Sequence, residues 1–218
     1  RGRGRGASMS LHPAGGGDGP PEVIYIIRHG EKPGDLSPAH RKHQGPVFGV
    51  DYRGAKDEHS LLPRGWQRSG ALTALFAPAA GPPRSGLRTP AALLSPSHGD
   101  PAKSAVRRTY QTIQGLADHL GLAIGTPFEV GHEPQLAASV LAAYSGVVLI
   151  CWEHSHIPVI AKSLPTAKSA AVPVAWPDDR YDVIWAFTRL PGEPRVRYGF
   201  SQVPQRLLAG DSHKVIPG

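Results

Sequence analysis

The sequence predicts an α/β domain: a three-layer sandwich with a mostly parallel central sheet, helices on both of its faces and an antiparallel hairpin at its edge. Two runs, residues 23–27 and 147–152, are continuously apolar or aromatic. Such runs are typical of strands that are buried on both faces. Segments with helical spacing lie between the predicted strands, an order typical of parallel sheets. A chain of 218 residues is long enough for one sizeable core.

The first predicted strand, residues 23–27, runs directly into Arg28, His29 and Gly30. A cation and an imidazole therefore lie at the carboxyl edge of the sheet, where open α/β sheets bind ligands. Gly30 lets the backbone turn sharply and leaves room for a ligand to approach. This order predicts a functional site around His29.

Residues 32–60 are polar, rich in glycine and proline, and without a period of a helix or strand. They predict a long loop, which either forms a wall or lid over the site or is a solvated insertion. The first helix follows from about residue 61. Leu72, Leu75 and Phe76 form its apolar face, and it ends before Pro78.

Residues 90–97 predict a short second strand, and the next helix begins at Ser104, a suitable N-cap. Arg108 lies near the start of that helix. Helix N-termini favour anions, and a guanidinium adds a fork of donors that suits phosphate. The residues expected to face the core from this helix are Val106, Tyr110, Ile113, Ala117 and Leu120.

Residues 122–130 predict a third strand, and Glu133 opens the helix that follows it. Residues 147–152 form the next buried strand, which closes with Glu153 and His154. His156 follows two positions later, and a helix continues over residues 157–164. Residues 183–188 and 196–200 predict an antiparallel hairpin at the sheet edge.

Taken in order, these motifs resemble those of the histidine phosphatase superfamily, the phosphoglycerate-mutase-like and acid-phosphatase-like enzymes. Arg28-His29-Gly30, followed by Glu31, is similar to the superfamily's signature. Gly65 and Gln67 resemble its second landmark, although they are one residue closer here and Ser69 replaces the usual alanine. Ser104-x-x-x-Arg108-x-x-Gln-Thr and His154-Ser155 resemble the third and last landmarks. The resemblance covers about residues 24–164.

The resemblance implies a phosphoryl-transfer site in which His29 becomes phosphohistidine, while Arg28, Arg108 and His154 hold the phosphoryl oxygens. It implies that Glu133 protonates the leaving group. Glu129, Glu153 and Asp182 remain alternatives for that role. We also expect Glu31 and His156 to contact the substrate.

These residues predict a phosphatase that hydrolyses a phosphomonoester without a metal or cofactor. The alternatives are a phosphoglycerate-mutase-type phosphotransferase and a catalytically silent protein that binds a phosphorylated ligand. A metal hydrolase would use His154 and His156 with His29 or His59 and an aspartate. Histidines two apart at a strand end face different ways, which argues against it. Cys151 lies inside an apolar strand with no arginine after it, which argues against a cysteine phosphatase.

The composition indicates the class of partner. The net charge of +7 suits a small phosphorylated substrate better than nucleic acid, and we expect phosphate or sulfate to bind in the pocket.

No apolar run approaches the ~18–20 residues that span a bilayer. The single cysteine excludes an internal disulfide and indicates a cytoplasmic protein. Residues 1–20, rich in glycine and proline, predict a disordered tail or an artificial remnant, and residues 21–218 predict one domain. The oligomeric state stays open.

Overall fold

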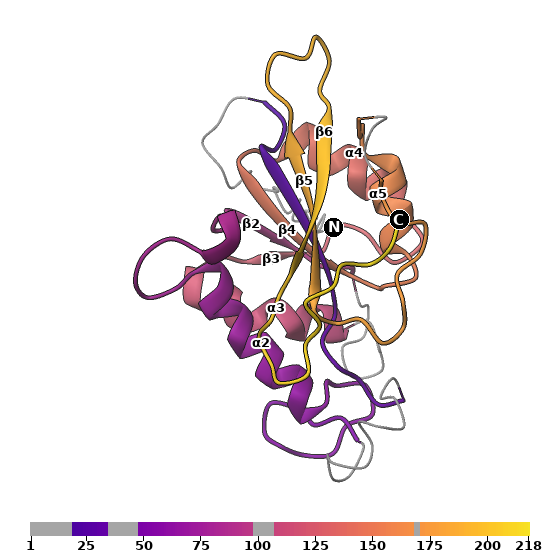
Figure 1. Ribbon diagram of the computed structural model, residues 1–218. Coiled ribbons are helices and arrows are strands. Elements are labelled where there is room, and N and C mark those ends of the chain that lie inside the picture. Colours follow the sequence, from indigo (N-terminus) through magenta and orange to yellow (C-terminus); the bar gives the residue numbers. More distant parts are fainter. Residues whose placement is uncertain (1–18, 35–47, 98–106, 168–170) are drawn as a thin grey trace, which may run out of the picture.

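A computed structural model describes residues 19–34, 48–97, 107–167 and 171–218. Within them lies one open sheet of six strands in the order β3-β2-β4-β1-β5-β6 (Figure 1). The strands are β1 (Val23–Arg28), β2 (Ala92–Leu94), β3 (Ile124–Gly125), β4 (Val147–Trp152), β5 (Val183–Arg189) and β6 (Tyr198–Pro204). The helices are α2 (Pro63–Phe76), α3 (Arg107–Leu120), α4 (Glu133–Ala143) and α5 (Ile157–Ser163), with a 3-10 turn at Arg84–Gly86.

The sheet is mixed. β4 pairs in parallel with both β1 and β2, and β2 pairs in parallel with β3. β5 is antiparallel to β1, and β6 is antiparallel to β5, so the predicted hairpin is present at the edge of the sheet. From β1 to β5, the helices and strands of the described residues alternate as they do in α/β domains, which agrees with the predicted class.

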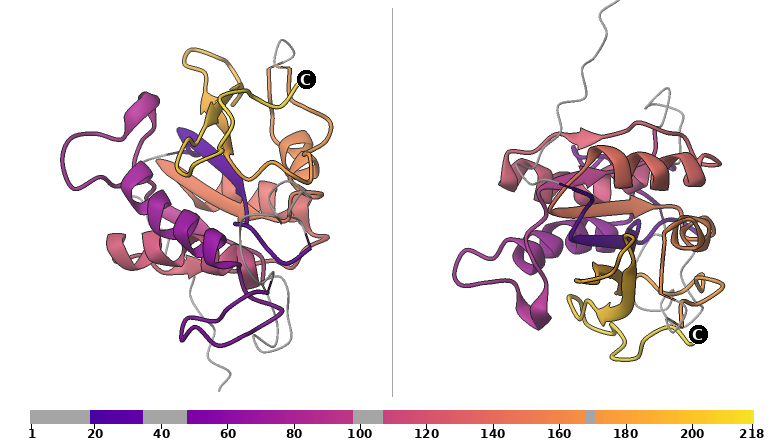
Figure 2. Two further views of the ribbon diagram at one scale, coloured as in Figure 1. Left: turned by 60° about the horizontal axis from the view of Figure 1, so that its bottom comes forward. Right: turned by 90° about the horizontal axis from the view of Figure 1, so that it is seen from above.

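Alternate residues of β1 belong to two different hydrophobic clusters. Ile24 and Ile26 pack with residues of α4 and α5, whereas Tyr25 and Ile27 pack with residues of α2 and α3. Figure 2 shows α2 and α3 running side by side. Because both kinds of position on β1 are buried, its sequence is continuously apolar rather than alternating.

The third strand is much shorter than the sequence predicts. An extended segment is expected throughout residues 122–130, but only Ile124–Gly125 pair with the sheet. Their partner β2 has three residues, and Pro127 has no backbone N–H for a longer ladder. The predicted second strand shortens in the same way, from residues 90–97 to Ala92–Leu94, between Pro90 and Pro96.

Helix α3 buries a face slightly different from the predicted one. Ile113 and Ala117 are buried as expected, together with Leu116, whereas Tyr110 is only half-buried. Ser104 and Val106 lie outside the described residues, as do residues 1–18 of the predicted tail and residues 35–47 of the predicted loop. Among the described helices, none is both long and apolar enough to cross a bilayer.

Close packing between two glycines fixes the turn after β1. A Cβ atom on Gly65, in the first turn of α2, would lie 2.6 Å from the carbonyl oxygen of Glu31. One on Gly30 would lie 3.1 Å from the Gly65 Cα. The Leu62 amide also donates to the Glu31 carbonyl at 2.9 Å. The Gly65 region therefore has a packing function, holding α2 against the residues that follow His29.

Candidate active site

The candidate site lies where β1 and β4 end. Arg28 is paired in register with Trp152, so His29 and Glu153 leave the sheet at the same edge. His29 is fully buried, and its Nδ1 lies 2.7 Å from the carbonyl oxygen of Gly30. A carbonyl can only accept a hydrogen bond, so Nδ1 must carry the proton that is donated.

Because of this hydrogen bond, the lone pair of a neutral His29 ring lies on Nε2. In a neutral imidazole with its proton on Nδ1, Nε2 carries a lone pair. Among the described residues, His29 Nε2 has no hydrogen-bond partner. Its nearest ionic neighbour is Oε2 of Glu153 at 3.6 Å, which is longer than a hydrogen bond. Nε2 of His29 is therefore buried and, among the described residues, has no hydrogen-bond partner.

His154 approaches the same carboxylate. Its Nδ1 lies 3.8 Å from Oε2 of Glu153, and its Nε2 lies 2.8 Å from Oδ1 of Asp178. Its ring meets that of His29 edge to face, with centroids 6.1 Å apart. Burial lowers the pKa of His154, and the charges of Arg28 and His29 lower it further, outweighing the hydrogen bond to Asp178. Without a ligand, His154 is therefore predominantly neutral at pH 7.

Arg28 joins the site to the segment before β5. Its guanidinium donates to the carbonyl oxygens of Asp178 and Pro177, the latter at 3.3 Å, and to the Tyr181 hydroxyl at 3.3 Å. Its Cζ lies 3.9 Å from the centre of the Tyr181 ring, a cation–π contact. Because a guanidinium carries five N–H donors, one side chain can hold a loop and also meet an anion.

Arg108 is the second residue of α3 and is buried. The helix is attached to the turn after β1, since the Gly30 amide donates to Oγ1 of Thr112 at 2.7 Å, one turn from Arg108. Arg108 donates to the carbonyl oxygens of Ser60, at 3.3 Å, and Glu58.

The neighbouring Arg107 pairs with Asp57 and donates to Oγ of Ser60 at 3.2 Å. Both arginines therefore bind the described end of the predicted 32–60 loop. That end of the loop is therefore attached to the start of α3.

Glu133 does not contact His29. Its buried carboxylate accepts from the Gly131 amide and from Trp152 Nε1, each at 2.9 Å, and its Oε1 lies 3.1 Å from Nδ1 of His156. Burial raises the pKa of Glu133, but these hydrogen bonds and the charge of His156 together lower it below its ordinary value. Glu133 and His156 thus form a pair of their own between α4 and the start of α5.

Glu31 also has partners of its own. Its buried carboxylate lies 2.8 Å from Arg68 and 3.1 Å from Arg64, both on α2, and Arg68 pairs with Asp211 at 2.8 Å. Arg68 Nη1 also donates to Gln205 at 3.0 Å. This buried cluster joins the turn after His29 to the segment after β6, for which the sequence predicts nothing.

The other sequence candidates lie apart from the two histidines. Glu129 is exposed, and Asp182 binds Arg180 at 2.8 Å and the Ser212 amide. Cys151 is fully buried, and burial, reinforced by the charge of Glu153, raises the pKa of its thiol well above the usual range, which disfavours the reactive thiolate.

The pair of His154 and His156 does not converge on one point, because their Nδ1 atoms face Glu153 and Glu133 respectively. The described residues instead bring together His29, Glu153 and His154, one ligand atom of each lying within 4.8 Å of the others. Of these three residues, Glu153 was predicted only as one of several alternatives to Glu133 as the proton donor.

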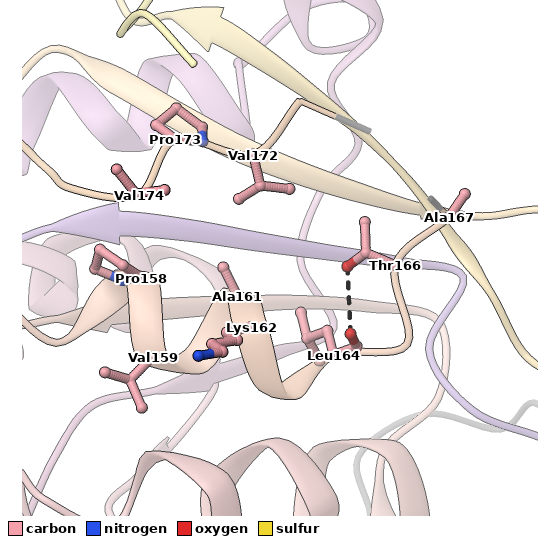
Figure 3. A pocket seen from close by; sticks show the side chains of 10 residues that line it. All are labelled: Pro158, Val159, Ala161, Lys162, Leu164, Thr166, Ala167, Val172, Pro173 and Val174. Atoms are coloured by element: carbon pink, nitrogen blue, oxygen red, sulfur yellow. Dashed lines mark hydrogen bonds between the residues drawn. The ribbon is translucent and has the colours of Figure 1, made fainter. Parts of the chain in front are cut away.

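A separate groove of about 540 Å³ lies between α5 and the segment that follows it (Figure 3). Its described walls are mostly apolar, with Lys162 as their one charged side chain, and they include none of the predicted site residues. The groove therefore lacks the converging cations that a phosphate ester needs.

Comparison of the chain with known protein families finds no family model that matches, and comparison with curated proteins finds no matching relative. The functional argument therefore rests on the motifs and on the geometry of the site.

Proposed function

We propose that this protein is a metal-independent phosphatase of the histidine phosphatase type, which hydrolyses a phosphomonoester through a phosphohistidine on His29. The observation that carries the proposal is the state of that side chain. It is buried, and its Nδ1 donates to the Gly30 carbonyl. Its Nε2, which carries the lone pair of the neutral ring, has no hydrogen-bond partner in the described part of the chain. Neutral imidazoles in this state are competent nucleophiles.

Three further side chains, at the end of β1, after β4 and at the start of α3, support the same chemistry. Arg28 and Arg108 are buried cations. A bound anion beside His154 would favour the protonated form of its imidazole. We assign these three the stabilisation of the charge on the phosphoryl oxygens, the main task in phosphoryl transfer. Two core clusters, one with α2 and α3 and one with α4 and α5, support the three-layer arrangement with helices on both faces of the sheet.

In the first step, Nε2 of His29 forms a bond to phosphorus while the bond from phosphorus to the ester oxygen breaks, and the leaving oxygen takes a proton. Water then attacks the phosphohistidine, the P–N bond breaks, and phosphate leaves. We assign the proton transfers to Glu153 in place of Glu133, because Glu153 lies 3.6 Å from Nε2 whereas Glu133 is bound to Trp152 and His156.

The electrostatics of Glu153 suit this cycle. Burial raises its pKa, whereas a protonated His29, through a hydrogen bond and its charge, together with Lys32 and the charge of His154, lowers it to about 2. With the His29 and His154 rings neutral, the lowering is smaller. An anionic phosphoryl group beside the carboxylate would raise its pKa again, as like charges do. At neutral pH Glu153 is a carboxylate, the form that takes a proton from the water that attacks the phosphohistidine. Glu31, held by Arg64 and Arg68, we assign a positioning role.

The test is hydrolysis of a generic aryl phosphate in EDTA between pH 4 and 9. Wild type should turn over and His29→Ala should not, whereas His119→Ala, a matched change at an exposed histidine of α3, should keep wild-type rates. Arg28→Ala and Arg108→Ala should each lose on the order of 10²–10³-fold in kcat. Mass spectrometry after an acid-free quench should find the phosphoryl group on His29.

Three outcomes would contradict the proposal. Turnover that persists in His29→Ala would remove the phosphohistidine. If wild type binds vanadate but hydrolyses no member of a broad panel of phosphomonoesters, the protein is a silent binder of phosphorylated ligands instead. Transfer of the phosphoryl group to an added alcohol or sugar phosphate in place of water would identify a phosphotransferase.

A further inference from the structure

Three electron-pair donors converge at the candidate site. His29 Nε2 and His154 Nδ1 lie 3.6 and 3.8 Å from the same oxygen, Oε2 of Glu153. Both ring nitrogens are buried and have no hydrogen-bond partner among the described residues. Side chains from the ends of two paired strands thus meet around one small volume.

The outer atoms of both rings orient these lone pairs inward. Nδ1 of His29 donates to the Gly30 carbonyl, and Nε2 of His154 donates to the Asp178 carboxylate. When both rings are neutral, the two nitrogens that face Glu153 carry lone pairs. The carboxylate oxygen of Glu153 that faces both nitrogens is the third donor. Three donors that converge on one point are an arrangement suited to a metal ion.

We propose that His29, Glu153 and His154 bind one Zn²⁺ ion when no phosphate is present, and that this ion inhibits the protein. The inhibitory part rests on the proposed phosphatase function, because Zn²⁺ on Nε2 of His29 would occupy the lone pair that attacks phosphorus. The binding part rests on geometry alone.

The distances fit a zinc ion after a small contraction. Zinc lies about 2.0–2.1 Å from imidazole nitrogens and about 2.0–2.2 Å from carboxylate oxygens, so the ligand atoms of a tetrahedral site are about 3.3 Å apart. The two separations from Oε2 are 3.6 and 3.8 Å, and all three ligand atoms lie within 4.8 Å of one another. Small rotations of the side chains would close the site.

The ligand chemistry selects the metal. Two imidazoles and one carboxylate are the donor set of open zinc sites, where the fourth position takes water or substrate. Mg²⁺ and Ca²⁺ prefer oxygen ligands and would bind poorly here. Histidine ligands of metals usually donate their other N–H to a carbonyl or carboxylate, as His29 does to Gly30 and His154 to Asp178.

Binding is tested on the full chain, stripped with EDTA and desalted, by titrating Zn²⁺ calorimetrically and against a chromogenic zinc indicator. Wild type should bind one equivalent, and Mg²⁺ should give no signal. Glu153→Gln and His154→Ala should each weaken zinc binding by more than about 10-fold. Asp178→Asn, which changes only a group that orients His154, should weaken it by about 10–100-fold.

His156→Ala is the matched control for His154→Ala, because its Nδ1 faces Glu133 and lies outside the three-ligand set. It should keep the affinity of wild type for Zn²⁺. The binding proposal is refuted if wild type binds no stoichiometric zinc, or if Glu153→Gln and His154→Ala, folded by circular dichroism, bind zinc as wild type does.

Inhibition is tested with aryl phosphate at buffered free Zn²⁺. The KM should rise in proportion to zinc while kcat stays constant, and EDTA should restore the original rate. A rate that does not change with the zinc concentration would refute the inhibition by zinc but not the proposed phosphatase activity. Stoichiometric zinc binding without any turnover would leave the metal site intact and refute the phosphatase. Turnover that needs zinc would make the ion a cofactor and overturn its inhibitory role.

Discussion

Replacing Gly65 by alanine should displace the turn after His29, because the added Cβ would contact the backbone of Glu31. The added Cβ would lie 2.6 Å from the carbonyl oxygen and 3.0 Å from the amide nitrogen of Glu31. These are backbone atoms, which cannot swing aside as the end of a flexible side chain can. Gly70 lies on the same helix and is exposed, and a Cβ atom added there would meet no described atom within 4 Å. It provides the matched control.

The magnitude follows from two opposing effects. Exchange of glycine for alanine inside a helix stabilises by about 0.8–1.0 kcal/mol. Gly70→Ala should show this gain, which corresponds to a rise in Tm of about 2–4 °C for a chain of this size. Gly65→Ala has to accommodate overpacking that costs about 1–3 kcal/mol. The free energies of unfolding of the two variants should therefore differ by about 1–3 kcal/mol.

Urea unfolding measures the stability difference, and hydrolysis of an aryl phosphate measures its effect on the site. Because Glu31 is two residues from His29, a displacement there should lower kcat in Gly65→Ala by up to about 10²-fold, the effect of a misplacement of about 1 Å. Gly70→Ala should keep the wild-type kcat. Equal stabilisation by both substitutions, with kcat unchanged, would refute the close packing of α2 against this turn.

Two further predictions concern the buried ion cluster. Arg68→Met should destabilise the protein by about 3–5 kcal/mol in urea unfolding, because the carboxylates of Glu31 and Asp211 stay buried without their cation; Arg88→Met, which breaks the exposed pair with Glu22, should cost about 0–1 kcal/mol. Burial raises the pKa of Asp211, but Arg68 and two backbone amides lower it below its unfolded value. Its contribution to stability is therefore present above about pH 4 and lost as the pH falls through the folded pKa. Unfolding free energies between pH 6 and 3 should fall less steeply in Asp211→Asn, and equal slopes would contradict this assignment.

The elements that were predicted correctly are those whose pattern follows from their own burial. β1 and β4 pair with strands on both sides and are covered by apolar clusters, so their buried run is visible in the sequence. The length of β3 depends instead on how much of β2 is available to pair with it. That is a property of a partner about 30 residues away, and no local pattern records it.

The role of Glu31 could not be predicted for a similar reason. A carboxylate directly after an Arg-His-Gly turn is compatible with a substrate contact or with an ion pair, and the sequence does not distinguish them. Its partners are Arg68 on α2 and, through that arginine, Asp211 after β6. Pairings over such separations are fixed by tertiary structure, whereas helical periodicity identifies only the apolar face of α2.

Glu133 and Glu153 were distinguishable in principle from strand register. Order along the chain favours Glu133, which opens a helix after the third strand, but the Trp152 indole and His156 hold its carboxylate. Glu153 directly follows β4, as His29 directly follows β1, and the two strands are parallel neighbours that end level with each other. Residues one step beyond paired strand ends must emerge together. The Glu153 carboxylate at that position therefore faces His29, which is why the catalytic and zinc-binding proposals share it.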